Sequence, residues 1–460
     1  MYFSSTMDYS GTVHLLLILA RFSFTTSNNV DALCKECRCT GVPVTDVDCE
    51  RKGLTRVPGG STWPRNARTM NLASNFIVSL SVLEKSNITK LDVHHNKLKD
   101  IEPDVFEHFP HLEFLDLSNN ALGTLHMNTF RSLSNLKVLN ISHNEIRTLP
   151  SEIFYPLVSL EKLRLGHNPL RYMDKAWFTK VPKLHFLDMS SIDAHALPEG
   201  IFHLTDLTQL VMTGNEFDEI PSALRSAKRL KSLDVSDNPV SMLTIASFFK
   251  LKELEEIYIT NMPQLESVEA DTFVTQEKLR ALHLHNNPNL EEVDVEAFGI
   301  FWRITEDTNW TLRQLHLQDN NMKFLSENTA PWDEIEVLDL QGNPWACECT
   351  NAWMRKLNLH QELTVRLRCA SPAKYEETSL LDAPEELFEC HHVEDLEYHR
   401  ENIHAAVLAL LIVTVLGMAL VFVCVMRRRH GVFCGRQKHN GSVYYVKAHT
   451  NPLDAAADNF

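Results

Sequence analysis

The chain has 460 residues, too many for one ordinary compact domain, and 44% of them are hydrophobic, which excludes an intrinsically disordered protein. The formal net charge of -16 argues against nucleic acid as the main partner, because a phosphate backbone requires a basic surface. Proteins, glycans and cations remain as classes of partner.

The N-terminal end indicates an exported protein. A short apolar run at residues 13–20 is followed by a stretch rich in Ser and Thr, as in a signal peptide. We therefore assign residues 1–28 to a cleaved signal peptide. Because no Lys or Arg precedes the run, a buried strand is the alternative.

Residues 29–58 form a small cysteine-rich segment. Its four cysteines are Cys34, Cys37, Cys39 and Cys49. The spacing Cys34-x2-Cys37 also occurs in zinc and redox sites, but an even number of cysteines in an exported chain favours disulfides.

Residues 59–344 repeat one motif. On the frame L-x-x-L-x-L-x-x-N-x-L, one segment reads Leu112-x-x-Leu115-Asp-Leu117-x-x-Asn120-x-Leu122, and the others follow at intervals of mostly 23 or 24 residues. The column that asparagine dominates has twelve members: Asn75, Asn96, Asn120, Asn144, Asn168, Ile192, Asn215, Asn238, Met262, Asn287, Asn320 and Asn343. The pattern predicts about twelve repeats, each contributing a short strand, inward-facing leucines and an asparagine that bonds backbone groups.

This motif resembles that of the extracellular leucine-rich repeat family, in its single-pass transmembrane form with cysteine-rich caps at both ends. The resemblance covers nearly all of the chain between the leader and the predicted membrane span. It implies an α/β solenoid: a leucine-rich repeat arc with parallel β-strands on its concave face, disulfide-capped at both ends, followed by one transmembrane helix.

Two features depart from the frame. Ile192 and Met262 cannot supply the side-chain amide, so we expect the arc to be irregular there. The interval of 33 residues from Asn287 to Asn320 holds an insertion that brings Phe301 and Trp302 into a loop. Both rings could bind a partner, since loops on a rigid scaffold often do, or they could simply cover the core.

A second cysteine-rich segment, residues 345–392, follows the repeats and contains Cys347, Cys349, Cys369 and Cys390. Four cysteines alone allow three pairings. Both cysteine groups resemble the caps of the family, and the resemblance implies that the first cysteine pairs with the third and the second with the fourth. The implied bonds are Cys34 with Cys39, Cys37 with Cys49, Cys347 with Cys369 and Cys349 with Cys390.

A membrane anchor is expected after a short stalk at residues 393–404. Residues 405–426 carry no charge and would span about 33 Å as a helix, enough for a bilayer core. Arg427, Arg428 and Arg429 follow directly, which places the tail 427–460 in the cytoplasm and the N-terminus outside the plasma membrane. Cys424 and Cys434 near the inner membrane face are either palmitoylated or inert thiols.

Modification and adaptor sites follow from short motifs. Asn87, Asn140 and Asn309 lie in sequons of the predicted ectodomain, and a glycan on Asn140 would obstruct the concave face. In the tail, Tyr444 and Tyr445 could be phosphorylated and the C-terminus could be bound by cytoplasmic adaptors.

The residue between the two strand leucines is expected on the concave face in every repeat. This column reads Asn71, Asp92, Asp116, Asn140, Arg164, Asp188, Val211, Asp234, Tyr258, His283, His316 and Asp339. Asp92 and Asp116 could approach each other across neighbouring strands, but a shallow open face does not favour catalysis, and solvated or docking carboxylates are the preferred interpretation. No phosphate-binding loop, nucleophile elbow or H-E-x-x-H motif occurs, so we expect no enzyme, cofactor or metal.

The hypothesis for binding is a patch of Tyr258, His283, His285 and His316 with Phe301 and Trp302, because aromatic residues dominate interface hot spots. The three histidines could instead bind zinc or sense pH, or could be merely solvated. We therefore predict a cell-surface glycoprotein that binds an extracellular protein ligand or a cell-surface receptor in adhesion, recognition or as a receptor or co-receptor. The alternatives are a regulator of a neighbouring membrane receptor, a structural protein that binds matrix or glycans, and an enzyme using the carboxylate column.

Overall fold

The computed structural model describes residues 30–58, 63–64, 66–81, 86–300 and 310–390. The chain divides into two units, 1–389 and 390–460, and nearly all the described residues belong to the first. The predicted signal peptide, stalk, membrane span and tail lie outside the described residues. So do residue 29 of the N-terminal cap and residues 391–392 of the C-terminal cap.

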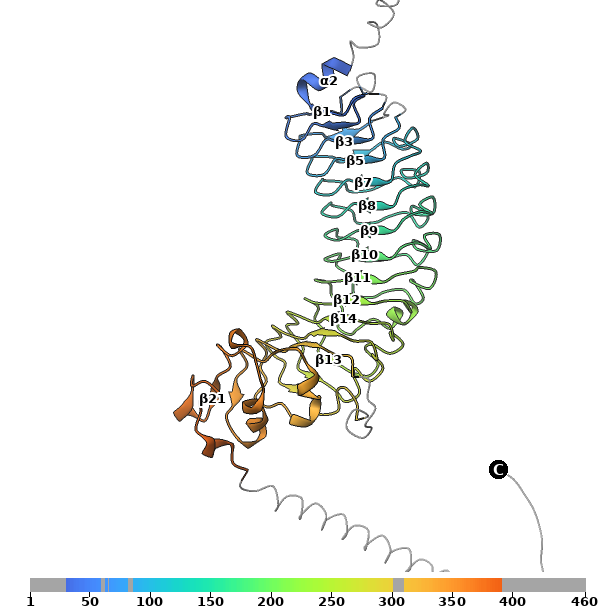
Figure 1. Cartoon of the computed structure of the whole chain (residues 1–460). Coiled ribbons are helices and arrows are strands. Elements are labelled where there is room, and N and C mark those ends of the chain that lie inside the picture. Colours follow the sequence, from blue (N-terminus) through green and yellow to red (C-terminus); the bar gives the residue numbers. More distant parts are fainter. Residues whose placement is uncertain (1–29, 59–62, 65, 82–85, 301–309, 391–460) are drawn as a thin grey trace, which may run out of the picture. The chain divides into compact units, whose positions relative to one another are not determined.

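A single 14-stranded sheet runs through the described part of unit 1 (Figure 1). The first two strands are antiparallel, and every later strand pairs with its predecessor in parallel. In sheet order the strands are β1 Arg38–Thr40, β2 Asp46–Asp48, β3 Thr69–Asn71, β5 Lys90–Asp92, β7 Phe114–Asp116, β8 Val138–Asn140, β9 Lys162–Arg164, β10 Phe186–Asp188, β11 Gln209–Val211, β12 Ser232–Asp234, β14 Glu256–Tyr258, β16 Ala281–His283, β18 Gln314–His316 and β19 Val337–Asp339. The last twelve correspond to the twelve predicted repeats.

The alternation of side chains along each strand explains the sheet. The middle residue, such as Leu115 or Leu187, is fully buried, whereas the residues on either side of it are mostly partly exposed. Successive strand residues point to opposite faces, so one face joins the solenoid core and the other stays open to solvent. One strand alone could not bury its leucine, and stacking the repeats makes the core continuous.

Asparagine side chains tie neighbouring repeats together as predicted. The Asn144 amide donates to the carbonyls of Leu117 and Ile141, each at 3.1 Å, and its Oδ1 accepts from the Leu122 N–H at 3.1 Å. Asn144 is buried, so these bonds satisfy backbone groups that no water reaches.

The expected irregularity at Ile192 and Met262 is wrong for the sheet. The strands of these two repeats, β10 and β14, keep the common register with both neighbours. At Ile192, a main-chain carbonyl takes over the role of the missing acceptor oxygen: the Arg171 N–H donates to the Ile192 carbonyl at 2.8 Å. Main-chain bonds between repeats therefore preserve the register where the side-chain amide is absent.

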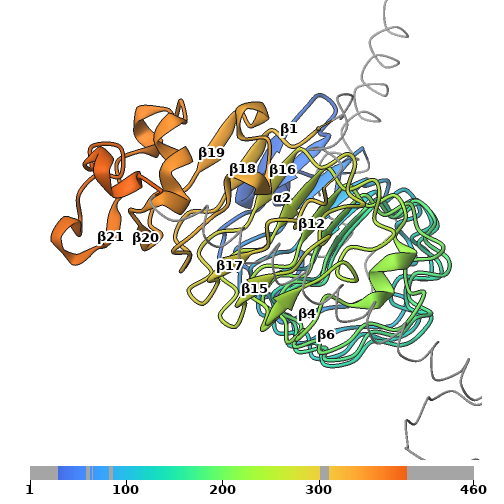
Figure 2. The ribbon, with the colours of Figure 1, turned by 90° about the horizontal axis from the view of Figure 1, so that it is seen from below.

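The opposite side of the solenoid is less regular. It holds two small parallel sheets, β4 Ser79–Leu80 with β6 Asp100–Ile101, and β13 Met242–Leu243 with β15 Ser267–Val268 and β17 Glu292–Val293 (Figure 2). The 3-10 helix η2 Ser222–Ser226 lies between β11 and β12 along the chain. Buried phenylalanines stack between repeats, with ring centroids 6.0 Å apart for Phe178 and Phe202 and 5.5 Å apart for Phe248 and Phe273.

Disulfide-bonded segments adjoin both ends of the repeats. The N-terminal cap contains helix α2 Val30–Glu36, strands β1 and β2, and the disulfides Cys34–Cys39 and Cys37–Cys49. The C-terminal cap contains the disulfide Cys347–Cys369, and Cys349 and Cys390 are also disulfide-bonded. Its elements and those of the last repeat are η3 Glu327–Thr329, η4 Trp332–Glu334, β20 Trp345–Ala346, η5 Cys349–Lys356, η6 Gln361–Leu363, β21 Cys369–Ser371, η7 Ala373–Tyr375 and η8 Glu385–Phe388.

Tryptophans seal the C-terminal end of the core. Trp353 of η5 is buried, and its indole N–H donates to the Leu325 carbonyl of the preceding repeat at 2.8 Å. Its ring stacks on Trp332 at 4.4 Å. The cap therefore covers apolar surface that the last repeat would otherwise expose.

Among the described residues, no helix is both long and apolar enough to cross a bilayer. The span predicted at residues 405–426 lies outside them.

Candidate functional site

The candidate site is the open face of the main sheet, which we call the concave face. The third residues of the twelve repeat strands pair with one another in an unbroken register from Asn71 to Asp339. This confirms the predicted column. The insertion after β16 does not displace it, because His283 still pairs with His316.

Local hydrogen bonds hold most of the acidic residues in the column. Asp116 Oδ1 accepts from the Ser118 N–H at 2.9 Å and from the Ser118 hydroxyl at 2.6 Å. Asp188 binds Ser190 in the same way, at 3.0 and 2.7 Å. These carboxylates therefore support the turn that follows their own strand, which is a structural role.

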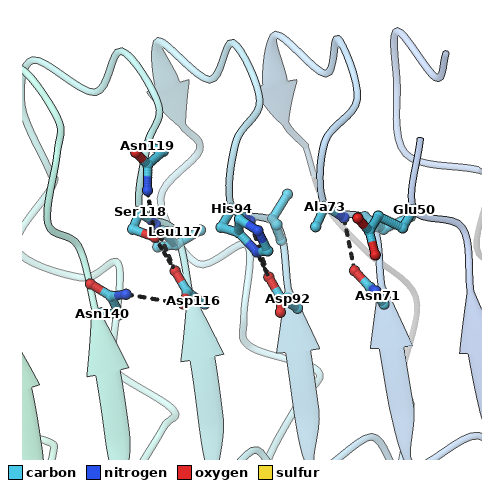
Figure 3. A network of polar contacts seen from close by, with 12 residues as sticks. Glu50, Asn71, Ala73, Asp92, His94, Asp116, Leu117, Ser118, Asn119 and Asn140 are labelled. Atoms are coloured by element: carbon cyan, nitrogen blue, oxygen red, sulfur yellow. Dashed lines mark hydrogen bonds and ion pairs between the residues drawn. The ribbon is translucent and has the colours of Figure 1, made fainter. Parts of the chain in front are cut away.

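The N-terminal part of the concave face contains a tight polar cluster (Figure 3). Asp92, His94 and Asp116 each offer one atom that could bind a metal, and these three atoms lie within 4.8 Å of one another. The sequence predicts this approach for the two aspartates. His94 Nδ1 is 2.6 Å from Asp92 Oδ1, and the Asn140 amide donates to Asp116 Oδ2 at 3.0 Å. The aspartates are thus engaged with separate partners and do not form the shared-proton pair that acid-base chemistry uses.

His94 was not singled out from the sequence. It occupies the fifth position counted from the start of its strand, as His285 does, so the period of two could have identified it. An Asp, His, Asp donor set is of the kind that binds zinc, but here its oxygens already accept hydrogen bonds within the protein.

Near the other end of the face, aromatic rings form what we call the imidazole stack: Tyr258, His283, His285 and His316. The rings of Tyr258 and His283 are parallel within 6° with centroids 4.2 Å apart, and those of His283 and His316 are parallel within 6° at 4.7 Å. His285 packs edge-on, 6.3 Å from both His283 and His316. The structure thus brings together the four described members of the predicted patch.

Burial governs ionisation in the stack. Burial, reinforced by a hydrogen bond to Glu256, raises the pKa of Tyr258 to about 12. Burial and the nearby His316 lower the pKa of His283, although Glu256 opposes this. Burial and His285 likewise lower the pKa of His316, against the opposing effect of Asp339. At neutral pH Tyr258, His283 and His316 are therefore uncharged.

Glu256 is a further residue of the site that the repeat motif does not indicate. It begins β14, and its Oε1 accepts from the Tyr258 hydroxyl at 2.7 Å and lies 3.6 Å from His283 Nε2. The His283 Nε2 and His285 Nδ1 atoms are buried and make no hydrogen bond within the described part of the chain. First and third strand residues share a face, so Glu256 could have been found beside Tyr258.

A residue of the C-terminal cap also reaches this region. The Arg366 guanidinium forms a two-pronged ion pair with Asp319, with Nη2 donating to Oδ2 at 3.0 Å. The hydrogen bond from Arg366 lowers the pKa of Asp319. These residues are 47 positions apart, so no local pattern indicates the contact.

The remaining predicted sites have mixed outcomes. Phe301, Trp302 and Asn309 lie outside the described residues. Asn87 is exposed. Asn140 is partly buried. Its side-chain amide donates to Asp116, and its Oδ1 accepts from the Ser142 hydroxyl at 2.7 Å.

A sequence model of the family described as "Leucine rich repeat" matches residues 65–122, 86–146, 115–170, 134–193 and 228–288. These segments coincide with strands β3 to β10 and β12 to β16 of the main sheet.

Similar proteins share parts of this repeat region. Chondroadherin from Homo sapiens is 35% identical over 72 residues, 16% of this chain and 20% of that protein, and nephrocan from Mus musculus is 27% identical over 218 residues, 44% of this chain and 42% of that protein. The match thus spans less than half the length of either relative. The solved leucine-rich repeat domain of APL1B aligns with a TM-score of 0.50 at 19% identity, covering 77% of this chain and 94% of that domain, which shows the fold.

Proposed function

We propose that this chain, whose repeats match a sequence model of the leucine-rich repeat family, binds another protein outside the cell through its concave face. The observation that carries the proposal is the imidazole stack, in which four ring side chains from β14, the β16 repeat and β18 form one half-buried aromatic surface. Partly buried aromatic rings on an open face are typical of interface hot spots.

The cellular setting is part of the proposal. Disulfides near both ends of the repeats favour an oxidising compartment. The leader, the apolar segment 405–426 and the arginines after it favour a single-pass plasma-membrane protein with its N-terminus outside. In this setting the protein acts as an adhesion, recognition or receptor molecule. Regulation of a receptor in the same membrane is the second candidate.

Proximity labelling from the predicted ectodomain of the full chain on intact cells tests the proposal. We expect labelled proteins to include a partner whose recovery falls strongly in the double variant Tyr258→Ala, His316→Ala. The variant Tyr172→Ala, His167→Ala is the matched control, because it removes the same side chains from exposed positions outside the repeat strands.

Equal loss of labelling in both variants, or no loss in either, would refute binding through the stack. Partners on opposing cells would favour adhesion or recognition. Partners confined to the same membrane, and unaffected by truncation after Arg429, would favour the regulatory role.

A further inference from the structure

The charge around the imidazole stack indicates what kind of partner segment it accepts. We call the surface formed by Asp234, Glu256, the imidazole stack and Asp339 the C-terminal patch. Asp234 lies on β12, and its charge together with that of Glu256 contributes to the raised pKa of Tyr258. Asp339 on β19 acts on His316 from the other side. Three carboxylates therefore lie near the stack; Asp234 and Glu256 are partly exposed, and Asp339 is buried.

These carboxylates have no basic counterpart on the neighbouring strands. From β11 to β19, no first or third strand residue of the main sheet is Lys or Arg, whereas Lys90, Lys162 and Arg164 occupy such positions nearer the N-terminus. Beside the stack, Asp319 and Arg366 form an ion pair, and the charge of Arg366 also acts on Asp339. With neutral histidines the C-terminal patch is acidic, which complements a basic segment.

The histidines give this surface a second charge state. His283 lies 3.6 Å from Glu256, His316 is adjacent to Asp339, and His285 is close to Asp319. Protonation of His283 and His316 would therefore place positive charge beside Glu256 and Asp339. The Nε2 atom of His283, which makes no hydrogen bond among the described residues, is an atom at which a further proton can reside.

We propose that the C-terminal patch docks an arginine- or lysine-rich segment of the extracellular partner at neutral pH and releases it when His283 and His316 are protonated. This inference rests on the proposed function and adds the chemistry of the partner and its regulation. The lowered pKa values of His283 and His316 place the release below about pH 6.5, the ordinary value for histidine.

Binding of a fluorescent oligoarginine peptide to the full chain in mild detergent, followed by fluorescence anisotropy at constant ionic strength, tests both parts. Arginine does not titrate in this range, so the probe keeps its charge. We expect the dissociation constant to rise about tenfold between about pH 7.4 and about pH 5.5, from two protonations close to the bound charges. In the double variant His283→Gln, His316→Gln, we expect the dissociation constant to change less than about twofold over the same pH range.

Two matched controls come from the chain itself. His143 and His167 form another stacked pair, with centroids 4.0 Å apart, and replacing both with Gln should leave the acid-induced release intact. Asp234→Asn, Glu256→Gln should weaken binding at neutral pH. The control is the double variant Asp206→Asn, Glu253→Gln, which makes the same change of net charge in exposed ion pairs. It should leave binding at neutral pH unchanged.

Undiminished release in the His283→Gln, His316→Gln variant would overturn the pH mechanism. If that variant does not fold, as judged by its thermal melt, the single variant His316→Gln should show a reduced pH effect, and an unchanged effect would have the same meaning. Equal weakening by both acidic double variants would overturn the docking site. Either result would leave protein binding itself to be decided by the labelling experiment with Tyr258→Ala, His316→Ala.

Discussion

At the scale of single residues, the buried asparagines are the clearest link between sequence and stability. Asn168 has 1% of its surface exposed, donates to the carbonyls of Ile141 and Leu165 at 2.9 and 2.8 Å, and accepts from the Ile146 N–H at 3.1 Å. Its side chain thus satisfies backbone groups of two repeats that nothing else reaches.

Replacing Asn168 with Ala should lower the free energy of unfolding by about 3 kcal/mol, because several buried backbone groups lose their partner. Urea unfolding followed by circular dichroism measures this. The control is Asn135→Ala, which removes an exposed bond to the Pro110 carbonyl and should cost less than about 1 kcal/mol. Similar losses in the two variants would mean that the asparagine ladder does not stabilise the solenoid.

At the scale of elements, the junction between the last repeat and the C-terminal cap depends on a glycine. Gly342 follows β19 with a φ of +69°, a conformation that disfavours other residues. A Cβ atom added to Gly342 would collide with the Asp319 side chain and come within 2.8 Å of the Arg366 side chain. These two residues form the ion pair that joins the cap to the repeats. The main chain also bonds here, from the Gly342 N–H to the Arg366 carbonyl at 3.1 Å.

Gly342→Ala should therefore destabilise the protein by about 2 kcal/mol, through backbone strain and the displaced ion pair. Thermal melts can be compared with those of two controls. Gly123→Ala meets nothing within 4 Å and has no positive φ, and Gly200→Ala has a φ of +74° but open space around it. An effect of Gly342→Ala no larger than that of Gly200→Ala would show that the contact with the ion pair is unimportant.

At the scale of the whole molecule, the predicted topology and glycosylation decide how much of the concave face is available. A C-terminal epitope tag should be stained only after cells are permeabilised, and an N-terminal tag after residue 28 should be stained on intact cells. Staining of the C-terminal tag on intact cells would contradict the predicted orientation.

Glycan mapping by mass spectrometry should find Asn87 occupied, since it is exposed. At Asn140, a glycan would break the hydrogen bond to Asp116 and cover the adjacent repeats. An occupied Asn140 would direct partners to the C-terminal patch, because β18 lies seven strands from β8 in sheet order.

The repeat, its twelve concave strands and the concave column follow from the sequence alone, because a period near 24 residues fixes the stacking and the period of two along a strand fixes which face a side chain occupies. The sequence also identified Tyr258, His283, His285 and His316 as neighbours, and the structure confirms that their rings are in contact. It was wrong at Ile192, because a motif cannot show that main-chain bonds compensate for a missing amide.

Only the tertiary structure decided how the stack is charged and how the cap is joined. Burial lowers the pKa of His283, and burial depends on what packs around the ring and not on its position in a motif. The ion pair of Arg366 with Asp319 joins residues 47 apart, and a repeat pattern carries no information about a contact made from outside the repeat. A repeat pattern predicts the features that every repeat shares, whereas the chemistry of one site depends on side-chain contacts that occur only at that site.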